Sequence, residues 1–245
     1  MATCRYNECS EAVCGVFAWC ILHLDFPKED DPEFTCIRDE KLLKTKEKIK
    51  AGDLNFEGTN IYDVDASDVS IPGQNNAIFK NATIKGRVRF EKTKIETSVW
   101  FEGAKIEKNA SFAGAEIGGD VRFEAAEIGG GATFAGAEIG GAALFKRAKI
   151  GKHATFAGAE IEGDVRFESA EIGEDAWFGG AQIGGDVRFE SAEIGEDAWF
   201  RDAQIRGDVR FEEAHIAGDV RFEGAKVSGD ALFEGAQIHG TLNLI

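Results

Sequence analysis

Residues 163–184 of this chain read GDVRFESAEIGEDAWFGGAQIG, and residues 185–206 repeat them as GDVRFESAEIGEDAWFRDAQIR. The copies differ only at Gly179/Arg201, Gly180/Asp202 and Gly184/Arg206. Each 22-residue copy contains two related units of 11 residues, one built around a Val-x-Phe step and one around an Ala-x-Phe step. An internal repeat of this kind dictates the architecture, so the repeat decides the fold more than any single motif does.

The same 11-residue unit continues on both sides of these copies. Phe recurs at every eleventh position from Phe79 to Phe233, and an aliphatic residue follows each Phe by five positions, from Ile84 to Ile238. Val or Ala stands two positions before each Phe, which places both side chains on one face of a strand. The spacing predicts strands of only about three residues. Glycines at the corners are expected to supply positive φ: Gly118, Gly119, Gly173, Gly184, Gly185 and Gly229.

An apolar repeat of 11 residues is also typical of a right-handed helical coiled coil. We reject that alternative because Gly recurs in nearly every unit, at a cost of about 1 kcal/mol per helical residue. The 22-residue copy indicates that two units close one coil with four short faces. We therefore expect one inner ladder of Phe167, Phe189 and Phe211, and an opposite ladder of Phe178, Phe200 and Phe222. The predicted fold is all-β, a right-handed parallel quadrilateral β-helix.

The Ala-x-Phe and Ala-x-Ile steps resemble the pentapeptide repeat, in which a central Phe or Leu and a preceding small residue point inward. That resemblance implies a right-handed quadrilateral β-helix, a solenoid repeat protein. This chain departs from the family pattern by alternating five- and six-residue steps. The resemblance covers about two-thirds of the chain and is far more specific for fold than for function.

Three regions follow from these patterns: a Cys/His-rich head at 1–36, a helix and irregular N-terminal cap at 37–76, and the β-helix at 77–245. The charged sequence at 38–51 predicts an amphipathic helix with Asp39 as its cap and Gly52 as its stop. Residues 56–61 match the repeat and predict an early irregular coil, whereas 63–76 break the period. Helix and irregular coil are expected to cover the first open edge of the β-helix.

All five cysteines lie in the first 36 residues. Two upstream thiols and a close Cys-x2-His pair could form a tetrahedral Cys₃His zinc site. The predicted ligands are Cys4, Cys9, Cys20 and His23, with Cys14 as a competing ligand; Cys20-Ile-Leu-His23 resembles a short zinc-knuckle ending. The alternative is a set of small buried thiols without metal.

The formal net charge is −16, from 44 acidic and 28 basic residues. Such a chain is repelled by bare nucleic acid and by anionic membrane surfaces, so neither is an expected partner. An odd number of cysteines and the lack of a basic leader favour a reducing compartment, and we expect a cytoplasmic protein. The apolar run at 12–22 is too short to span a bilayer.

The outward positions of the coils carry the remaining functional information. On one face we expect cross-coil ion pairs between an arginine row (Arg122, Arg166, Arg188 and Arg210) and a glutamate row (Glu168, Glu190 and Glu212). Asp164, Asp186 and Asp208 recur at a corner, where stacked like charges are expected to repel unless high salt screens them. Such screening would suit a saline host.

The opposite face carries Trp177, Trp199 and Arg221 at 22-residue spacing. Two stacked outward tryptophans predict a partner-contact patch, and Trp199 is positioned to meet Arg221 as a cation–π pair. Duplication of one coil explains the tryptophan pair equally well.

Catalysis is not indicated, because the four histidines form no Ser/His/Asp or His–Glu pattern. The prediction is a non-enzymatic scaffold or protein-interaction module. One alternative is a DNA mimic that binds a type II topoisomerase, which would require a homodimer through the C-terminal coil. Another is a self-assembling, filament-like protein.

Overall fold

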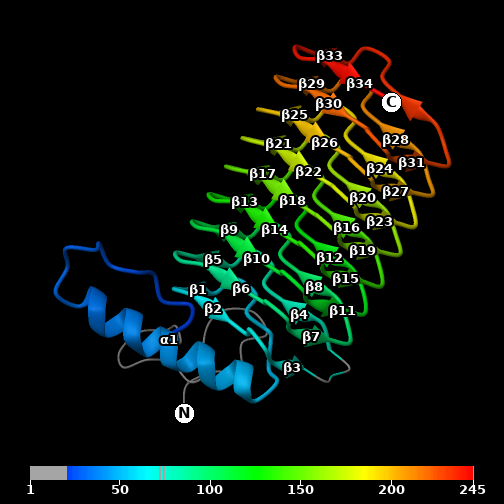
Figure 1. Ribbon diagram of the computed structural model, residues 1–245. Helices are drawn as coiled ribbons and strands as arrows, with labels where there is room; N and C mark the ends of the chain where they lie inside the picture. The colour runs from blue at the N-terminus through cyan, green and yellow to red at the C-terminus, as the bar shows by residue number, and fades with distance from the viewer. Residues whose placement is uncertain (1–20, 72, 74, 245) are drawn as a thin grey trace.

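The computed structural model describes residues 21–71, 73 and 75–244. Its short strands stack into four parallel sheets around one apolar core (Figure 1). The first sheet contains β1 (Asn60–Ile61), β5 (Thr83–Ile84), β9 (Lys105–Ile106), β13 (Glu127–Ile128), β17 (Lys149–Ile150), β21 (Glu171–Ile172), β25 (Glu193–Ile194), β29 (His215–Ile216) and β33 (Gln237–Ile238). The second contains β2 (Val64–Asp65), β6 (Val88–Arg89), β10 (Ala110–Ser111), β14 (Ala132–Thr133), β18 (Ala154–Thr155), β22 (Ala176–Trp177), β26 (Ala198–Trp199), β30 (Val220–Arg221) and β34 (Leu242–Asn243).

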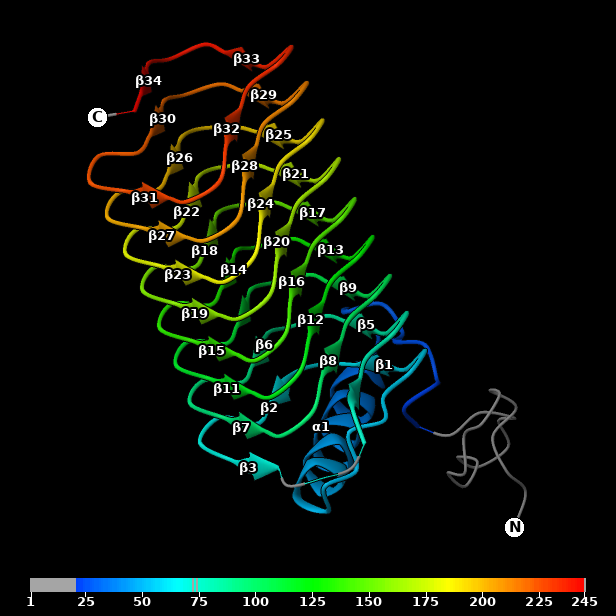
Figure 2. The same ribbon diagram turned by 90° about the vertical axis from the view of Figure 1, so that its right-hand side faces the viewer.

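The two remaining sheets have the same construction. The third contains β3 (Ser70–Ile71), β7 (Lys94–Ile95), β11 (Glu116–Ile117), β15 (Glu138–Ile139), β19 (Glu160–Ile161), β23 (Gln182–Ile183), β27 (Gln204–Ile205) and β31 (Lys226–Val227). The fourth contains β4 (Ala77–Ile78), β8 (Val99–Trp100), β12 (Val121–Arg122), β16 (Ala143–Leu144), β20 (Val165–Arg166), β24 (Val187–Arg188), β28 (Val209–Arg210) and β32 (Ala231–Leu232). Figure 2 shows how the chain visits the four sheets in turn within each coil.

The register shows that one coil is 22 residues long through the repeats. Ile172 pairs with Ile194, and Trp177 pairs with Trp199, both in parallel register. The predicted parallel β-solenoid with four faces and two units per coil is therefore confirmed. The strands contain two residues rather than the predicted three. One of the two inward residues of each face lies just outside the strand, as Phe167 does after Val165–Arg166.

The core is built from two ladders of Phe rings. Phe167 stacks on Phe189 with ring centroids 5.1 Å apart, and Phe178 stacks on Phe200 at 5.0 Å. Rings of opposite ladders meet edge to face, as Phe178 and Phe189 do at 5.9 Å and 86°. These rings are fully buried, and each stabilises the fold by about 1.5–3 kcal/mol relative to an exposed ring. The predicted pair of ladders is confirmed.

The corners differ from the prediction about glycine. Positive φ occurs at the second residue after each core Phe, as at Gly180 with φ +67°, and non-Gly residues such as Ser191 also adopt it there. The predicted corner glycines do not have positive φ. At Gly173 the constraint is space instead, since an added Cβ would lie 2.4 Å from the carbonyl oxygen of Gly151 in the preceding coil.

The N-terminal helix α1 (Phe34–Lys50) begins four residues earlier than predicted, with Glu33 rather than Asp39 as its N-cap residue. The reason is tertiary packing: the Phe34 ring lies 5.8 Å from Phe26 and 6.4 Å from Tyr62, which draws the first turn into helix. Gly52 ends the helix with φ +73°, as predicted.

The helix contacts β1 and β2, so it lies against the first coil. Ile49 joins the core. The ladders already begin at Asn60, earlier than the expected start of the β-helix at residue 77, because Val64 and Ile71 in the aperiodic segment still point inward. In the described part of the chain, no helix combines the length and apolar character that a bilayer crossing requires.

Candidate functional site

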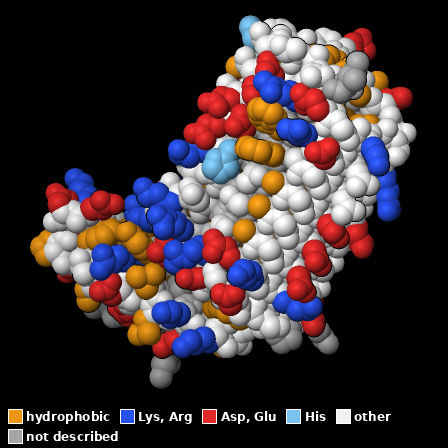
Figure 3. Space-filling view, in the orientation of Figure 1, with side chains coloured by type: hydrophobic (Ala, Val, Ile, Leu, Met, Phe, Trp, Pro, Cys, Tyr) orange, Lys and Arg blue, Asp and Glu red, His pale blue; other side chains and the backbone are white. Residues whose placement is uncertain are grey.

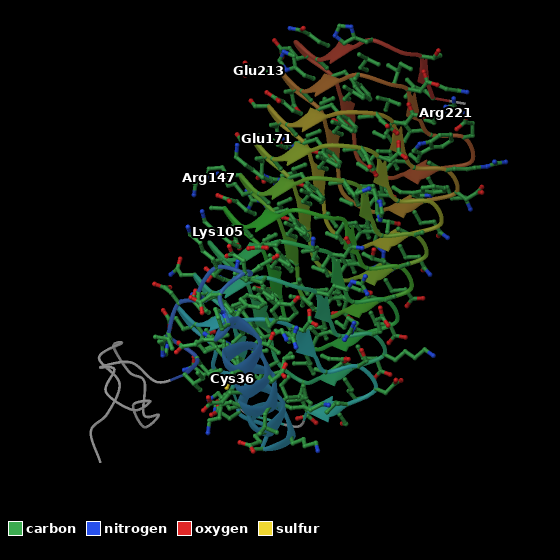
Figure 4. All side chains as sticks on the ribbon, turned by 90° about the vertical axis from the view of Figure 1, so that its left-hand side faces the viewer. Cys36, Lys105, Arg147, Glu171, Glu213 and Arg221 are labelled. Carbon is green, nitrogen blue, oxygen red and sulfur yellow. The ribbon has the colours of Figure 1, made fainter. Side chains whose placement is uncertain are left out.

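The outer side of the second sheet, here called the tryptophan face, is the candidate site. Its central column contains the outward residues of successive strands, at one residue per coil: Asp65, Arg89, Ser111, Thr133, Thr155, Trp177, Trp199, Arg221 and Asn243. Figure 3 views this side of the rod, where a mostly uncharged strip leads up to two large hydrophobic side chains. Figure 4 places Arg221 at the upper end of the rod, on the other side of the view from Lys105 and Glu171.

The structure stacks the three predicted contact residues on one another. The indole rings of Trp177 and Trp199 lie 5.9 Å apart at 24°, and the Arg221 guanidinium lies 4.3 Å from the Trp199 ring. Trp177 is 47% exposed, an unusual exposure for so large an apolar side chain. The geometry of the stack agrees with the prediction from 22-residue spacing, and the role in partner contact stays a prediction.

The difference between the two coil copies explains why Trp177 is open. A Cβ added to Gly179 would lie only 2.7 Å from the indole Nε1 of Trp177. The Trp177 ring therefore covers a residue that has no side chain. In the next copy Arg201 occupies the equivalent position, and Trp199 is only partly exposed. Trp177, the first ring of the stack along the chain, therefore has small residues beside it.

A strip of small residues extends from the tryptophan stack along the face. Beside Ser111, Thr133 and Thr155 runs a parallel column of Ala113, Ala135 and Ala157, each two residues further along its coil. These two columns contain no charged residue over those three coils. The strip contains only Ser, Thr and Ala side chains, so no residue type marks it in the sequence. The 22-residue period is nevertheless enough to place these residues side by side.

An aspartate ladder at the corner of this face holds Arg221 in place. Asp197 Oδ1 accepts a hydrogen bond from the Asp219 amide at 2.7 Å, and Asp219 Oδ1 accepts one from the Thr241 amide at 2.6 Å. The other Asp219 oxygen lies 2.5 Å from the Arg221 guanidinium. The Thr241 amide, followed by Arg221, holds the pKa of Asp219 below its usual range. Arg221 is therefore fixed between a carboxylate and an indole ring.

The outer side of the fourth sheet, here called the arginine face, corrects two predictions. Arg188 and Arg210 pair with Asp186 and Asp208 of their own coils, both at 2.7 Å, and not with the predicted glutamates. Arg166 does bond a glutamate, Glu168 at 2.5 Å, but within its own coil. Asp164 stands at the same corner beside Arg166, so the corner alone does not decide which acid an arginine binds. Arg122 lies 2.7 Å from Asp120 and also 3.7 Å from Glu102 of the preceding coil, so a cross-coil arginine–glutamate pair does occur there.

The recurring aspartates on the arginine face are not a repelling stack. Asp186 Oδ1 accepts a hydrogen bond from the amide of Asp208 at 2.9 Å. That backbone bond, followed by the Arg188 guanidinium, lowers the pKa of Asp186. Glu190 has the opposite shift, because burial and the neighbouring Glu168 and Glu212 raise its pKa. Each of these carboxylates is hydrogen-bonded to a backbone amide of the next coil, which offsets their mutual repulsion, and the saline host stays a prediction.

The third sheet presents a different surface, a long shallow groove lined by charged side chains such as Glu138. Lys94 lies 2.6 Å from Glu116, and Gln182 donates to Glu160 at 3.2 Å. The outward row is thus partly neutralised by its own neighbours. Unlike the middle of the tryptophan face, this groove carries a continuous row of charged and amide side chains.

Most of the predicted zinc ligands, namely Cys4, Cys9, Cys14 and Cys20, lie outside the described residues. His23 is described, and its Nε2 lies 3.1 Å from the carbonyl oxygen of Glu57. Within the described ranges no group of three or more His, Cys, Asp or Glu side chains is arranged to hold a metal ion. The zinc site stays a prediction.

Comparison with known proteins identifies the repeat. A family model described as pentapeptide repeats (9 copies) matches residues 74–116, 101–149, 145–193, 169–215 and 189–237. Together these matches cover residues 74–237, well over half of the chain. No curated protein and no solved structure is significantly similar to it.

Proposed function

Because this chain belongs to the pentapeptide-repeat family, we propose that it is a non-enzymatic β-solenoid scaffold that binds a protein partner through the tryptophan face. The observation that carries the proposal is the exposed stack of Trp177, Trp199 and Arg221 beside an uncharged strip. Protein interfaces are depleted of charge at their centre and enriched in aromatic residues and arginine. Trp and Arg also dominate the energetic hot spots of such interfaces.

The rigidity of the rod supports a scaffolding role. Backbone hydrogen bonds join each coil to the next, as from the Phe178 amide to the Trp199 carbonyl at 2.7 Å. Nine strands at about 4.8 Å spacing give a ladder roughly 38 Å long. Outward side chains are therefore held in fixed columns, which lowers the entropy lost when a partner binds.

The character of the described surface disfavours catalysis. His153 lies 3.5 Å from Glu174 and is 42% exposed, so this pair stands on an open corner rather than in a water-excluding site. The corners from β4 onward are short, and their side chains form flat faces and shallow grooves. Flat surfaces suit macromolecular contact better than the enclosure of a small substrate.

The DNA-mimic alternative is less well supported than a scaffold. A mimic of the phosphate backbone needs continuous rows of unneutralised acid. On the arginine face, Asp186 and Asp208 are paired with guanidinium groups, and the tryptophan face carries almost no acid in its middle. Topoisomerase binding, filament formation, a C-terminal-coil homodimer, zinc in the head and a cytoplasmic location remain predictions.

Affinity capture with the full chain tests the proposed contact face. The double substitution W177A/W199A removes the stack, and R188A/R210A on the arginine face is the matched control. We expect a partner to bind the wild type and the control and to be lost from W177A/W199A. A partner that binds all three forms equally would refute the role of the tryptophan face. Recovery of a type II topoisomerase that binds W177A/W199A as well as the wild type, and binds R188A/R210A at least as strongly, would favour the DNA mimic, because the arginine substitutions leave Asp186 and Asp208 without their cationic partners.

A further inference from the structure

We propose that the tryptophan face binds a second copy of this chain, with the two rods antiparallel. The inference rests on the proposed function of this face as a contact surface and specifies its occupant. It is carried by a match of size and charge between the two halves of the face. In a two-fold symmetric interface, if residue i of one copy meets residue j of the other, then residue j of the first copy also meets residue i of the second. The residues of the tryptophan face must therefore be complementary to the residues of the same face in reversed order.

The geometry that makes this test possible is the strict register of the second sheet. Each coil contributes one row of residues, and equivalent residues of successive rows form columns along the rod. The two-fold axis lies between the two faces and runs perpendicular to the rods. It reverses the order of the rows along the rod, and each column then faces the same column of the other copy. With the axis midway between the rows of Thr133 and Thr155, the eight rows from Asp65 to Arg221 lie opposite one another in pairs, and the ninth row, that of Asn243, extends beyond them.

The central column matches in this register. Trp177 lies opposite Ser111, so a protruding ring meets a small side chain. Trp199 lies opposite Arg89, whose long side chain can contact the partly exposed indole with its methylene groups. Arg221 lies opposite Asp65. Within one chain Arg89 already pairs with Asp65 at 2.8 Å, so an acid–base pair of one copy faces the arginine–indole pair of the other.

The flanking columns match in charge and size. Arg201 and Asp202, which are 71% and 72% exposed, lie opposite Glu91 and Lys92. Further opposite-charge matches are Asp197 with Arg87 and Glu174 with Lys108. Larger side chains again meet glycine, in the matches His153 with Gly131 and Lys152 with Gly130.

One match in these columns brings like charges together, Asp63 with Asp219. Both carboxylates are already hydrogen-bonded within their own chain, Asp63 to the Arg87 amide at 2.6 Å and Asp219 to the Thr241 amide at 2.6 Å. The repulsion is therefore weakened by donors that each copy supplies itself.

Shifting the axis by half a coil destroys the complementarity. With the axis on the Thr133 row, like charges meet in the matches Asp202 with Asp68, Asp197 with Asp63, and Lys152 with Lys108. With the axis on the Thr155 row, Arg221 meets Arg89 and Glu223 meets Glu91. Parallel rods would place each arginine of the central column opposite its own copy. The charge pattern thus favours the chosen antiparallel register over these two. An axis between the rows of Thr155 and Trp177 also avoids like charges, but it leaves Lys152 with Glu174 as its match between acidic and basic side chains, whereas the chosen register has several such matches.

The interface would be narrow, one sheet wide and eight rows long. Interfaces at the small end of the size range are weak and transient, so the dimer should form at micromolar concentration or above. Its strength would lie in the two symmetric tryptophan contacts, and its register in the charged rows around them.

Sedimentation velocity of the full chain, over a concentration series reaching about 1 mM, tests the proposal with charge reversals at one matched pair. The variants are E91R, R201E, and the double variant E91R/R201E, with E138R on the third sheet as the control. Each single reversal should raise the dimer Kd at least about tenfold, because like charges then meet at both symmetric contacts. The double variant should return to the wild-type Kd, and so should an equal mixture of the two single variants.

Recovery of the wild-type Kd in the mixture of single variants is specific to an interface in which the same surface of both copies is used. The thermal midpoint of each variant shows whether the substitution has changed the fold. A monomer at every concentration would overturn the proposal. So would a dimer that ignores both reversals, including one lost with L244D, which would be an end-to-end dimer through the C-terminal coil. A monomer that still captures a protein through Trp177 and Trp199 would overturn the dimer and leave the contact function standing.

Discussion

The arginine face and the tryptophan face lie on opposite sides of the same coil and share one backbone. A core Phe follows each strand of both faces from β4 to β32 in the chain, and both faces carry an aspartate ladder at one corner. The arginine face satisfies its own charges, since Arg188 and Arg210 pair with Asp186 and Asp208. The tryptophan face instead leaves Trp177 open beside small residues. The same backbone therefore supports different outward side chains, which is where selection for binding can act.

The largest expected effect tests whether the two faces are structurally equal. Phe178 follows the tryptophan strand β22, and Phe189 follows the arginine strand β24; both rings are fully buried. F178A and F189A should each lower the free energy of unfolding by about 3–5 kcal/mol, the range for deletion of a buried aromatic ring. Urea unfolding followed by circular dichroism measures both. Losses that differ by more than about 1 kcal/mol would break the equivalence.

The aspartate ladders should contribute the next largest effect, and unequally. D186A removes a backbone acceptor and an arginine partner, whereas D197A removes the acceptor alone. We expect losses of about 1–3 kcal/mol, larger for D186A. The control D186N keeps an acceptor oxygen, as Asn109 does for the Gly131 amide at 3.3 Å, and should cost less than D186A. Equal losses for the two alanine variants would mean that the arginine pair adds nothing.

The pH dependence of stability sharpens the same comparison. The pKa of Asp186 is lower in the folded state than the ordinary value of about 3.9, through the Asp208 amide and Arg188. Its contribution is therefore present above about pH 4 and lost as pH falls through the lowered folded pKa. The stability difference between wild type and D186A should shrink as the pH of urea unfolding is lowered from neutral. A difference that stays constant down to about pH 2 would contradict this assignment.

A smaller effect of opposite sign is expected at Glu190 on the arginine face. Burial, with Glu168 and Glu212 beside it, raises its pKa, so the folded state disfavours the ionised carboxylate. Stability from this group is present below the unfolded pKa and declines as pH rises through the folded one. E190Q should therefore raise the thermal midpoint at neutral pH, and the exposed control E193Q on the first sheet should not. A lower midpoint for E190Q would show that its carboxylate charge is needed.

The smallest effect on stability is expected where the proposed contact is strongest. W177A removes a half-exposed ring and should change the free energy of unfolding by no more than about 0.5 kcal/mol, as is usual for surface positions. The same urea assay measures it beside F178A, the adjacent position in the chain. A loss near that of F178A would mean that Trp177 is part of the structural framework and not a site kept open for contact.

Much of the fold is predictable from the sequence because the determinants are local and repeated. An inward Phe every eleventh residue allows one solution for stacking, and the 22-residue copy defines the coil. The pattern places the corner glycines correctly but for the wrong reason, because the close approach of the Gly151 carbonyl to Gly173 depends on the neighbouring coil. The start of α1 at Phe34 escapes prediction because it depends on contact with Tyr62, far along the chain.

The candidate site is predictable in part. Equal spacing is enough to place Trp177, Trp199 and Arg221 in one column. The partner of Arg188 is not predictable, since Asp186 and Glu190 both stand two residues away, one on each side, and Arg166 binds the glutamate in the same local sequence. The residues of the uncharged strip follow the 22-residue repeat of the sequence. They form one surface only because the fold places the Ser/Thr column beside the Ala column.

The sequence by itself determined the period, the identity of the core residues, the columns of outward side chains and the excess of acid. These follow from side-chain alternation and repetition, which act over a few residues at a time. The tertiary structure alone decided where the ladders begin, which acid each arginine binds, why particular corners need glycine, and that Trp177 stays open above Gly179. Each of these depends on distances between residues that are close in space and far apart in the chain, which no local pattern specifies.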